Sequence, residues 1–553
     1  MVTSGVDRRR PRWQTQVSRI RHGVVPVPVW AWVAALLWIG LASDFGLGIY
    51  DEGSLLVGAR SVAHGGVPSR DFWTAYPPGM FWLVGLAFRV FGEQIIVNRL
   101  LHDAIALGVC VAGYHLIATL VGRGRWPLVG FLSLALYVGA FRTPYGYPAV
   151  LCLLLGFWSL LELFGNGGAH SRRRLRRAGL AAGLCAILRY DIALYLVAAS
   201  VGGGLMLIVP PAGQAGRRRE VLRAAIDYLS GFLGPVLLAY GVLIALAGIG
   251  PVYAQLVEFP LRVFPRVRAL PLDRPFTFLF TAPRTSWEAT WFLIEFRRLL
   301  IYVGLVTAGV GAAFALIRTR RAVAPLLLAV SLLALAFFNQ FRVRSDATHG
   351  WPLVVTALVV GTALLGWAIA SQHRSVRVAG WISAVAWAVV LVPGMVHLGW
   401  SRLHARYLEP TAAVDSPAAA GIRIAASEGT NALLADLRTR AAGERFIFSG
   451  AVDHDQVVLN DALIYFLAGR QSPTPYPDLV PGVIDTEPVQ RDIVQALEAL
   501  NVRTIVLFDY VSSEPNDSSR NTHVDILDRM LREKFRQVAQ YQPYYRVLRR
   551  IEP

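Results

Sequence analysis

The chain has 553 residues, of which 55% are hydrophobic and 16% are charged, and its mean hydropathy is +0.47. Soluble domains contain about 25% charged residues, so this composition excludes an entirely soluble protein. Lys and Arg number 54 against 36 Asp and Glu, which gives a net charge of +18. The basic clusters alternate with apolar stretches, which is typical of orientation signals in membrane proteins, so we expect a lipid bilayer and no nucleic acid as partner.

The N-terminal part combines a basic segment with an apolar one. Residues 1–26 contain several Arg, and the apolar stretch 27–43 follows directly. A signal peptide needs a small-residue cleavage site after a short apolar core, and the run Leu41-Ala42-Ser43-Asp44 is a weak one. Because many apolar stretches follow, we interpret 27–43 as an uncleaved first span with the basic segment in the cytoplasm.

The apolar stretches predict about eleven membrane-spanning helices, since a helix crosses the hydrocarbon core with about 20 apolar residues. They fall at residues 27–43, 99–121, 126–141, 147–164, two within 179–209, 228–249, 298–317, 323–339, 351–371 and 379–399. The stretch 179–209 is too long for one helix and carries Arg189-Tyr190-Asp191 in its middle, which predicts two short helices meeting there. Met80–Phe91 is too short to span and is expected against the outer face.

The composition changes after residue 400. Residues 401–553 alternate polar helices with short apolar strands and predict a small α/β domain of ordinary domain size. The expected helices are 429–441, 486–500 and 522–537, and the expected strands are 446–448, 504–508 and 545–548. With an odd number of spans this domain is extracytoplasmic. The predicted fold is therefore an α-helical polytopic membrane domain over 27–400, with its first outer loop at 44–98, followed by the α/β domain.

With this topology, the unusual polar residues gather on the outer face. Ionisable groups at the membrane boundary are costly and therefore tend to face a cavity or a partner. Arg binds phosphate in bidentate fashion, and a carboxylate can take the proton of a hydroxyl group. Phosphate-binding cations beside a carboxylate base are suited to transferring a sugar from a lipid-phosphate donor to an acceptor hydroxyl. A single in-line displacement would invert the anomeric centre.

The first outer loop carries the most specific signals. They are the acidic pair in Ile49-Tyr50-Asp51-Glu52-Gly53, then Arg70-Asp71-Phe72, Tyr76-Pro77-Pro78-Gly79 and Asn98-Arg99. This arrangement, with many spans and an outer C-terminal domain, resembles the polyprenyl-phosphate-sugar-dependent glycosyltransferases of the GT-C superfamily. That group includes the protein O-mannosyltransferases and the lipid A aminoarabinose transferases. The resemblance implies a GT-C-like fold and a polyprenyl-phosphate-linked donor.

The resemblance also assigns roles to residues. It gives the role of catalytic base, or its close partner, to Asp51, with Glu52 as second candidate and Asp71 at the second acidic position of the loop. Relatives often place Lys or Arg beside the proline step to bind the donor phosphate, and Arg70 is the nearest cation here. The competing phosphate ligands are Arg189, Arg342, Arg344 and His349. The remaining residues expected to line the cavity are Tyr76, Tyr145, Asp191 and Asp346.

Structural interpretations of the same residues stay open. Asp51 and Glu52 suit the first turn of a helix, and Arg70 can pair with Asp71. Arg189 can form an internal salt bridge with Asp191. No cofactor is predicted. A divalent metal ion on Asp51, Asp346 and His349 is chemically plausible, but nothing in their spacing requires it.

Two other functions also remain open. One is a transporter or flippase of an anionic polyprenyl lipid, although no internal repeat is present. The other is a non-catalytic protein of the same fold. The preference for Arg over Lys and the richness in Ala, Val, Leu and Gly indicate a GC-rich bacterium, so the expected location is the cytoplasmic membrane. The sequence leaves open the sugar and the acceptor, which can be a cell-envelope glycan, a lipid or a protein.

Overall fold

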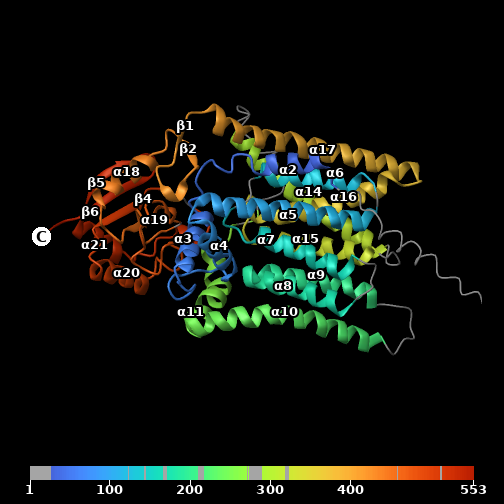
Figure 1. Ribbon diagram of the computed structural model, residues 1–553, viewed down its shortest axis with the longest axis horizontal. Coiled ribbons are helices and arrows are strands. Elements are labelled where there is room, and N and C mark those ends of the chain that lie inside the picture. Colours follow the sequence, from blue (N-terminus) through green and yellow to red (C-terminus); the bar gives the residue numbers. More distant parts are fainter. Residues whose placement is uncertain are drawn as a thin grey trace, which may run out of the picture.

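The structure, a computed structural model, has a bundle of long helices at one end and a small α/β domain at the other (Figure 1). It describes residues 27–122, 124–141, 145–165, 171–208, 217–270, 272, 289–317, 323–457, 459–510 and 514–552. The basic segment 1–26, predicted to be cytoplasmic, lies outside the described residues.

Each range predicted to span the membrane coincides with a helix of the bundle. The helices are α2 (Val29–Ile39), α5 (Ile95–Val121), α6 (Trp126–Ala140), α7 (Ala149–Phe164), α8 (Arg172–Leu188), α9 (Tyr190–Ile208), α10 (Arg217–Ala247), α14 (Ala289–Ile317), α15 (Ala324–Val343), α16 (Ala347–Ile369) and α17 (Arg374–Leu403). In the described part of the chain, 6 helices are long and apolar enough to cross a membrane, namely α5, α10, α14, α15, α16 and α17. The chain is therefore a multi-pass membrane protein, while the count of about eleven spans stays a prediction.

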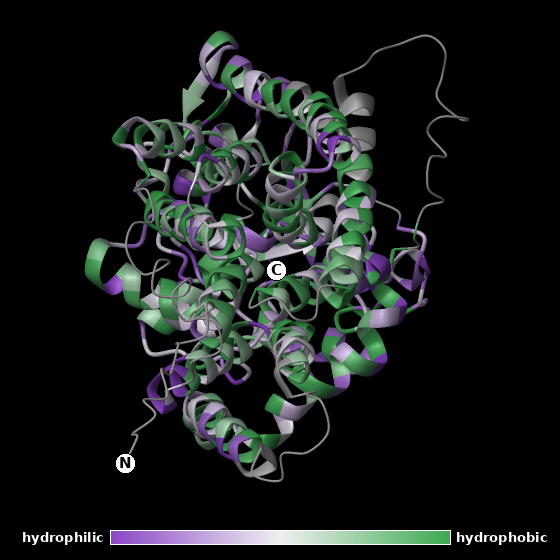
Figure 2. Cartoon of the chain, turned by 90° about the vertical axis from the view of Figure 1, so that its right-hand side faces the viewer, coloured by the Kyte–Doolittle hydropathy of each residue, from purple (hydrophilic) through white to green (hydrophobic). Residues whose placement is uncertain are grey.

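The outer helices of the bundle present apolar side chains to their surroundings. Helix α10 exposes Ile226, Leu229, Leu233, Leu237 and Leu238, and α17 exposes Trp381, Ile382, Val385 and Val389. Figure 2, which looks along the bundle, shows apolar residues along the outward sides of these helices as well as inside. Apolar patches of this extent are rare on proteins that face water, whereas lipid tails solvate them well.

The first outer loop forms a layer between the bundle and the C-terminal domain (Figure 1). It contains α3 (Asp51–Ala63) and α4 (Gly79–Phe91), which pack together, and Phe72 lies edge-on to Phe81 at 5.1 Å between ring centroids. The short helices α11 (Ile249–Tyr253), η1 (Ala254–Val263) and α12 (Phe264–Val267) follow α10. From η1 the side chain of Gln255 accepts a hydrogen bond from the Thr74 backbone N–H, which fixes the loop beside them.

The C-terminal domain is built on a four-stranded sheet with strand order β3-β4-β6-β5. Its strands are β3 (Phe448–Ala451), β4 (Thr504–Phe508), β5 (Phe535–Tyr541) and β6 (Tyr545–Arg550); β3 and β4 are parallel, and the other pairs are antiparallel. Helices α20 (Glu487–Ala499) and α21 (Ile526–Lys534) pack in one apolar cluster, and α18 (Thr430–Arg440) and α19 (Leu463–Leu467) pack in another. A two-stranded sheet of β1 (Thr411–Ala413) and β2 (Arg423–Ala425) lies near the bundle.

Helix α3 joins the two parts of the molecule through Arg60. Its guanidinium donates hydrogen bonds to the carbonyl oxygens of Tyr465, Phe466 and Arg470 at 3.0, 3.1 and 2.9 Å. The carbonyls of Tyr465 and Phe466 lie in the last turn of α19 and that of Arg470 lies just beyond it, where a cation is favourable. The Phe466 ring stacks on Phe88 of α4 at 5.7 Å. The first outer loop is therefore fixed to the C-terminal domain.

Candidate active site

A buried ion pair closes the first outer loop against the bundle. Arg99 of α5 is fully buried, and its guanidinium donates to both carboxylate oxygens of Glu52 at 2.9 and 2.8 Å. Its other N–H groups donate to the carbonyl oxygens of Ser43 and Gly46, both at 2.8 Å, and it lies 5.0 Å from the centre of the Tyr145 ring. Glu52 and Tyr145 thus hold the loop in place, and a carboxylate so fully engaged is poorly placed to take a substrate proton.

Asp51, next to Glu52, is in the opposite situation. It begins α3, its side chain is exposed, and it has no hydrogen-bond or ion-pair partner among the residues that the structure describes. Its backbone is nevertheless fixed, because the loop at Gly146 packs directly on it: a Cβ atom on Gly146 would lie 2.2 Å from the Asp51 carbonyl carbon. Adjacent residues point about 100° apart around a helix, so one acid anchors the loop while the other stays available.

Asp478 of the C-terminal domain faces the same place. Burial raises the pKa of Asp478, and the nearby charge of Asp51 raises it further, whereas a hydrogen bond with Ser54 and the charge of Arg268 lower it. When two carboxyl groups share a site, the proton is held by the one whose environment disfavours its charge. Asp478 therefore holds a proton more readily than an ordinary carboxyl group does.

Tyr76 connects this carboxyl pair with a buried cation. Burial raises the pKa of Tyr76, and Asp51 adds to that effect while Arg189 opposes it. The Arg189 guanidinium lies over the rings of Tyr76 and Tyr147, at 5.7 and 5.5 Å from their centres. It donates to both oxygens of Asp191 at 2.9 and 2.7 Å, which supports the salt bridge left open by the sequence. The short connection between α8 and α9 thus brings a neutralised Arg–Asp pair to the end of the bundle next to Tyr76.

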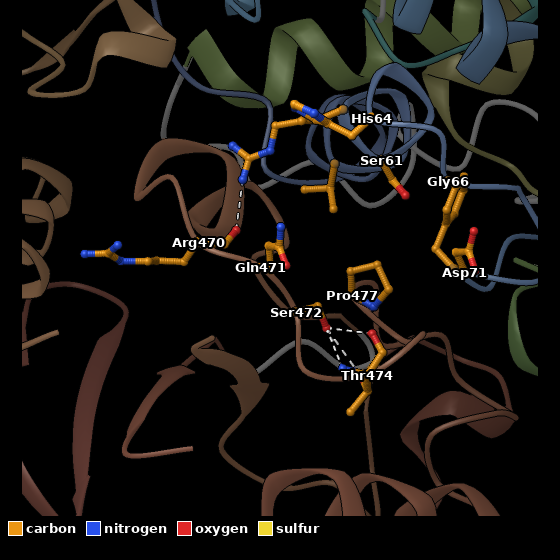
Figure 3. A pocket seen from close by; sticks show the side chains of 12 residues that line it. Ser61, His64, Gly66, Asp71, Arg470, Gln471, Ser472, Thr474 and Pro477 are labelled. Atoms are coloured by element: carbon orange, nitrogen blue, oxygen red, sulfur yellow. Dashed lines mark hydrogen bonds between the residues drawn. The ribbon is translucent and has the colours of Figure 1, made fainter. Parts of the chain in front are cut away.

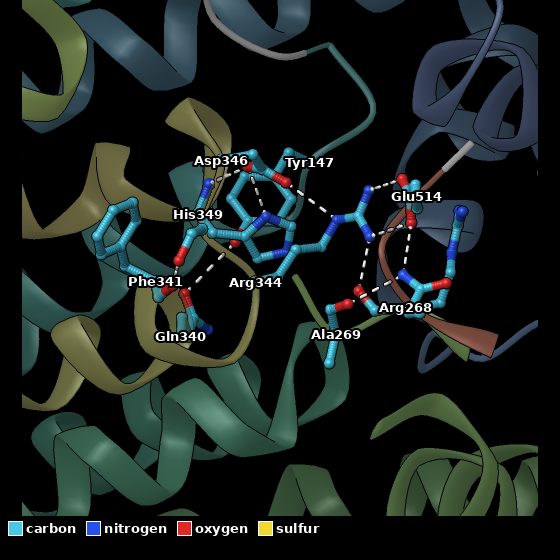
Figure 4. A network of polar contacts seen from close by, with 11 residues as sticks. Tyr147, Arg268, Ala269, Gln340, Phe341, Arg344, Asp346, His349 and Glu514 are labelled. Atoms are coloured by element: carbon cyan, nitrogen blue, oxygen red, sulfur yellow. Dashed lines mark hydrogen bonds and ion pairs between the residues drawn. The ribbon is translucent and has the colours of Figure 1, made fainter. Parts of the chain in front are cut away.

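A second polar cluster surrounds Arg344 at the end of α15 (Figure 4). Arg344 donates to Asp346 at 3.0 Å, to the two carboxylate oxygens of Glu514 at 2.7 and 3.1 Å, and to the Arg268 carbonyl oxygen at 2.6 Å. Asp346 caps α16 by accepting from the backbone N–H of His349 at 2.9 Å and also contacts its ring at 2.8 Å. Burial alone would raise the pKa of Asp346, but the His349 hydrogen bonds and the Arg344 charge lower it.

Tyr147 and Gln340 link the two clusters. The Tyr147 ring lies 5.7 Å from that of His349, and its hydroxyl donates to Gln340 at 3.4 Å. Gln340 in turn donates to Asp191 at 2.9 Å. One continuous set of polar side chains therefore extends from the bundle to Glu514 of the C-terminal domain.

The Arg344–Glu514 pair is expected to stabilise the contact between the two parts of the molecule. Replacing Glu514 by Gln should lower the free energy of unfolding by about 1–3 kcal/mol, because a charged hydrogen bond is lost in a largely buried setting. The check is the Tm of the detergent-solubilised full chain. As a control, Glu487→Gln removes the exposed Glu487–Arg491 pair and should change stability by at most about 0.5 kcal/mol. Equal Tm values for the two variants would contradict the assignment.

Arg70 and Asp71 lie elsewhere. Arg70 donates to both oxygens of the adjacent Asp71 at 2.9 and 2.8 Å, and this pairing lowers the pKa of Asp71. Asp71 faces a cavity of about 330 Å³ between α3 and the C-terminal domain (Figure 3). The cavity is lined by Val57, Arg60, Ser61, His64, Gly66, Asp71, Phe72, Arg470, Gln471, Ser472, Thr474 and Pro477. Ser61 lies about 15 Å along α3 from Asp51, so Arg70 and Asp71 are not brought to that residue.

Among the described cations predicted to bind the donor phosphate, Arg342 has the fewest contacts. It is exposed at the end of α15, and its guanidinium contacts the side-chain oxygen of Asn339 at 2.9 and 3.2 Å. No acidic partner is found for it among the described residues. Asn339 donates to the Tyr195 hydroxyl of α9 at 3.0 Å, so Arg342 lies where α15 and α9 meet at the surface of the bundle.

The sequence-predicted site residues therefore divide into groups. The structure brings together Asp51, Tyr76, Arg189, Asp191, Arg344, Asp346 and His349. Glu52 and Tyr145 anchor the loop beneath, Arg342 lies at the surface of the bundle where α15 meets α9, and Arg70 and Asp71 lie near the far end of α3. Sequence reasoning missed Asp478, Glu514 and Gln340, since no local pattern marks them and their partners are distant along the chain.

A metal site on the predicted residues is not assembled. No group of three or more His, Cys, Asp or Glu side chains in the described ranges is placed to hold an ion. His349 and Asp346 contact each other, and Asp51 does not join them in such a group.

Comparison with known proteins gives a match at the level of structure. No family model and no curated protein matches the sequence. A solved structure of ArnT from Cupriavidus metallidurans bound to undecaprenyl phosphate is similar over 94% of this chain and 97% of that chain, with 14% sequence identity and a TM-score of 0.53. The chain has the ArnT fold. The predicted α-helical polytopic membrane fold with a C-terminal α/β domain is thereby confirmed.

A further solved structure is the arabinofuranosyltransferase AftD from Mycobacteria. It is similar over 94% of this chain and 41% of the AftD chain, with 15% identity and a TM-score of 0.46. Within the ArnT fold of the present chain, the polar network described above lies where the helical bundle meets the C-terminal domain (Figures 1 and 4).

Proposed function

We propose that the chain transfers a sugar from a polyprenyl-phosphate-linked donor to an acceptor hydroxyl at the outer face of a bacterial cytoplasmic membrane. The observation that carries the proposal is the exposed Asp51 carboxylate, which has no partner among the described residues and lies beside Asp478 at the end of the bundle. The ArnT fold supports it, since the similar ArnT structure holds undecaprenyl phosphate.

In this proposal Asp51 is the general base. It accepts the proton of the acceptor hydroxyl as the oxygen attacks the anomeric carbon, and the bond from that carbon to the phosphate oxygen breaks. The lipid phosphate leaves with the bonding electron pair, and the anomeric configuration is inverted. Cations around the leaving phosphate stabilise the negative charge that develops on it.

Arg342 is the favoured phosphate ligand among the predicted cations. Arg189 and Arg344 are already paired with carboxylates, and Arg70 with Asp71. Arg342 contacts only an amide oxygen among the described residues, so its guanidinium retains donors for a bidentate phosphate contact. Arg342 lies where α9 and α15 meet at the surface of the bundle, and in this proposal the lipid tail stays in the bilayer beside these helices.

The orientation belongs to the same proposal. Residues 1–26 are cytoplasmic, 27–400 form the catalytic membrane domain, and 401–553 form an extracytoplasmic domain. The basic clusters between predicted spans support this orientation, because Arg accumulates on the cytoplasmic side of bacterial membrane proteins.

The test is a transfer assay with the purified full chain in nanodiscs. Radiolabelled polyprenyl-phosphate sugars (arabinose, mannose and aminoarabinose) are supplied with a cell-envelope extract, with and without EDTA. We expect label in an envelope product in both conditions, and transfer abolished by EDTA would contradict metal-independent chemistry. No transfer from any donor, together with donor movement across vesicle membranes, would overturn the proposal in favour of a transporter.

A further inference from the structure

Three exposed tyrosines gather beside Asp51. Tyr50 precedes α3, Tyr510 follows β4, and Tyr544 lies in the turn before β6. Their exposed fractions are 47%, 42% and 39%, although aromatic rings of this size are usually buried more deeply. The three segments are distant in sequence, so the gathering is a product of the fold.

The tyrosines are held in fixed positions by contacts with one another and with the sheet. Tyr510 lies edge-on to Tyr544 at 5.4 Å, and both pack on the buried Phe508, at 5.8 and 5.6 Å between ring centroids. Burial raises the pKa of Tyr50, and the nearby Tyr510 adds to that effect, which places the two side chains close together. The backbone N–H of Asp509 donates to the Tyr544 carbonyl oxygen at 2.6 Å. These contacts form a preorganised aromatic surface that reaches from the sheet to the residue before Asp51.

The three tyrosines suit neither an interface with a second copy of the chain nor an anchor in the bilayer. Three partly exposed tyrosines offer on the order of 300 Å², whereas each partner in a stable protein interface buries about 800 Å². Interfacial anchors in membranes lie at the ends of spanning helices. Tyr510 and Tyr544 instead lie next to the ends of strands β4 and β6 in the C-terminal domain.

The chemistry of the surface suits sugar rings. An aromatic face carries partial negative charge and attracts C–H groups, and a pyranose or furanose ring presents such groups on one face. The phenol hydroxyls can donate to or accept from the hydroxyl groups at the ring edge. We propose that Tyr50, Tyr510 and Tyr544 form an acceptor platform that binds the sugar rings of a glycan and directs its terminal hydroxyl to Asp51.

This inference rests on the proposed transferase activity and selects a glycan among the three acceptor classes left open above. The platform ends at Tyr50, so a glycan lying on it ends at the carboxylate that would activate its hydroxyl. A chain of rings can occupy all three tyrosines, whereas a lone hydroxyl on a protein side chain would gain nothing from Tyr544.

The experiment compares the full chain in nanodiscs with the double variant Tyr510→Ala/Tyr544→Ala. Defined arabinan and mannan oligosaccharides of increasing length serve as probes. Binding is measured without donor by saturation-transfer NMR, and acceptor KM and kcat are measured with donor. We expect acceptor KM to rise about tenfold in the double variant with little change in kcat, because two stacking contacts are lost and the base is intact.

Two control variants separate the platform from general effects. Tyr510→Phe/Tyr544→Phe keeps the rings and should stay within about twofold of the unmodified chain in KM. Tyr407→Ala removes another exposed tyrosine, 58% exposed and stacked on Arg406, and should leave KM unchanged. If the double alanine variant transfers sugar with an unchanged acceptor KM, the proposed acceptor platform is wrong, whereas the proposed transferase activity is supported. If the tyrosines are needed for oligosaccharide binding but no donor supports transfer, the proposed function is wrong, whereas the proposed glycan-binding surface is supported.

Discussion

Asp51→Asn is expected to lower the rate of sugar transfer by about 10²–10⁴-fold, the usual contribution of a general base. Asparagine has nearly the same shape but cannot take a proton from the acceptor hydroxyl. Because the Asp51 side chain is exposed and has no partner among the described residues, folding should be unchanged. Initial rates at saturating donor, measured beside the Tm of each preparation, test both statements.

Asp71→Asn is the matched control for this result. Asp71 is also an exposed carboxylate of the first outer loop, but it pairs with Arg70 near the other end of α3. Its substitution should change the transfer rate by no more than about twofold, because an exposed ion pair contributes little. Full activity of Asp51→Asn would remove this residue from the mechanism and direct attention to Asp478, whereas a large loss in Asp71→Asn would show that the cavity in Figure 3 belongs to the reaction.

Breaking the buried Glu52–Arg99 pair should have the largest effect on stability. Arg99→Met leaves the Glu52 carboxylate buried without its cation, which costs about 3–5 kcal/mol. Typical proteins are stable by only about 5–15 kcal/mol. We therefore expect a much lower Tm and a low yield of monodisperse protein from detergent, whatever the chemistry of the site.

The double variant Glu52→Gln/Arg99→Met tests whether the instability of Arg99→Met comes from the unpaired Glu52 charge or from the changed packing of the shorter side chain. Removing both charges should restore part of the stability that Arg99→Met loses, because no buried charge remains unpaired. Arg89→Ala, which removes an exposed guanidinium bonded to the Ala63 and Val62 carbonyl oxygens, should have a small effect by comparison. A double variant as unstable as the sum of its single variants would mean that the two charges do not act together.

The helical part of the fold could be predicted because long apolar stretches have few alternatives in a membrane. The division of 179–209 at Arg189 follows from the length of the stretch and the polar triplet in its middle, and α8 and α9 meet there. The different environments of Asp51 and Glu52 could not be predicted. Adjacent acids look alike in sequence, and only the distant Arg99 decides which one is buried.

In the C-terminal domain, local patterns predicted β4 and β6 but missed β5. The helix expected over 522–537 ends at Lys534, and β5 begins at Phe535. This strand is at the edge of the sheet and exposes many of its side chains, so its sequence lacks the apolar run of a central strand. Asp478 and Glu514 escaped prediction for a related reason: their partners Ser54 and Arg344 belong to the membrane part, far away along the chain.

The contact between Arg60 and α19 also has a bearing on biosynthesis. Arg60 and the Tyr465 carbonyl it binds are 405 positions apart. At about 5–20 residues per second, a ribosome needs roughly 20–80 s to make that intervening length. During this time α3 has already been made but lacks the partner that fixes it. The packing of α3 against the C-terminal domain therefore forms only when synthesis is almost finished.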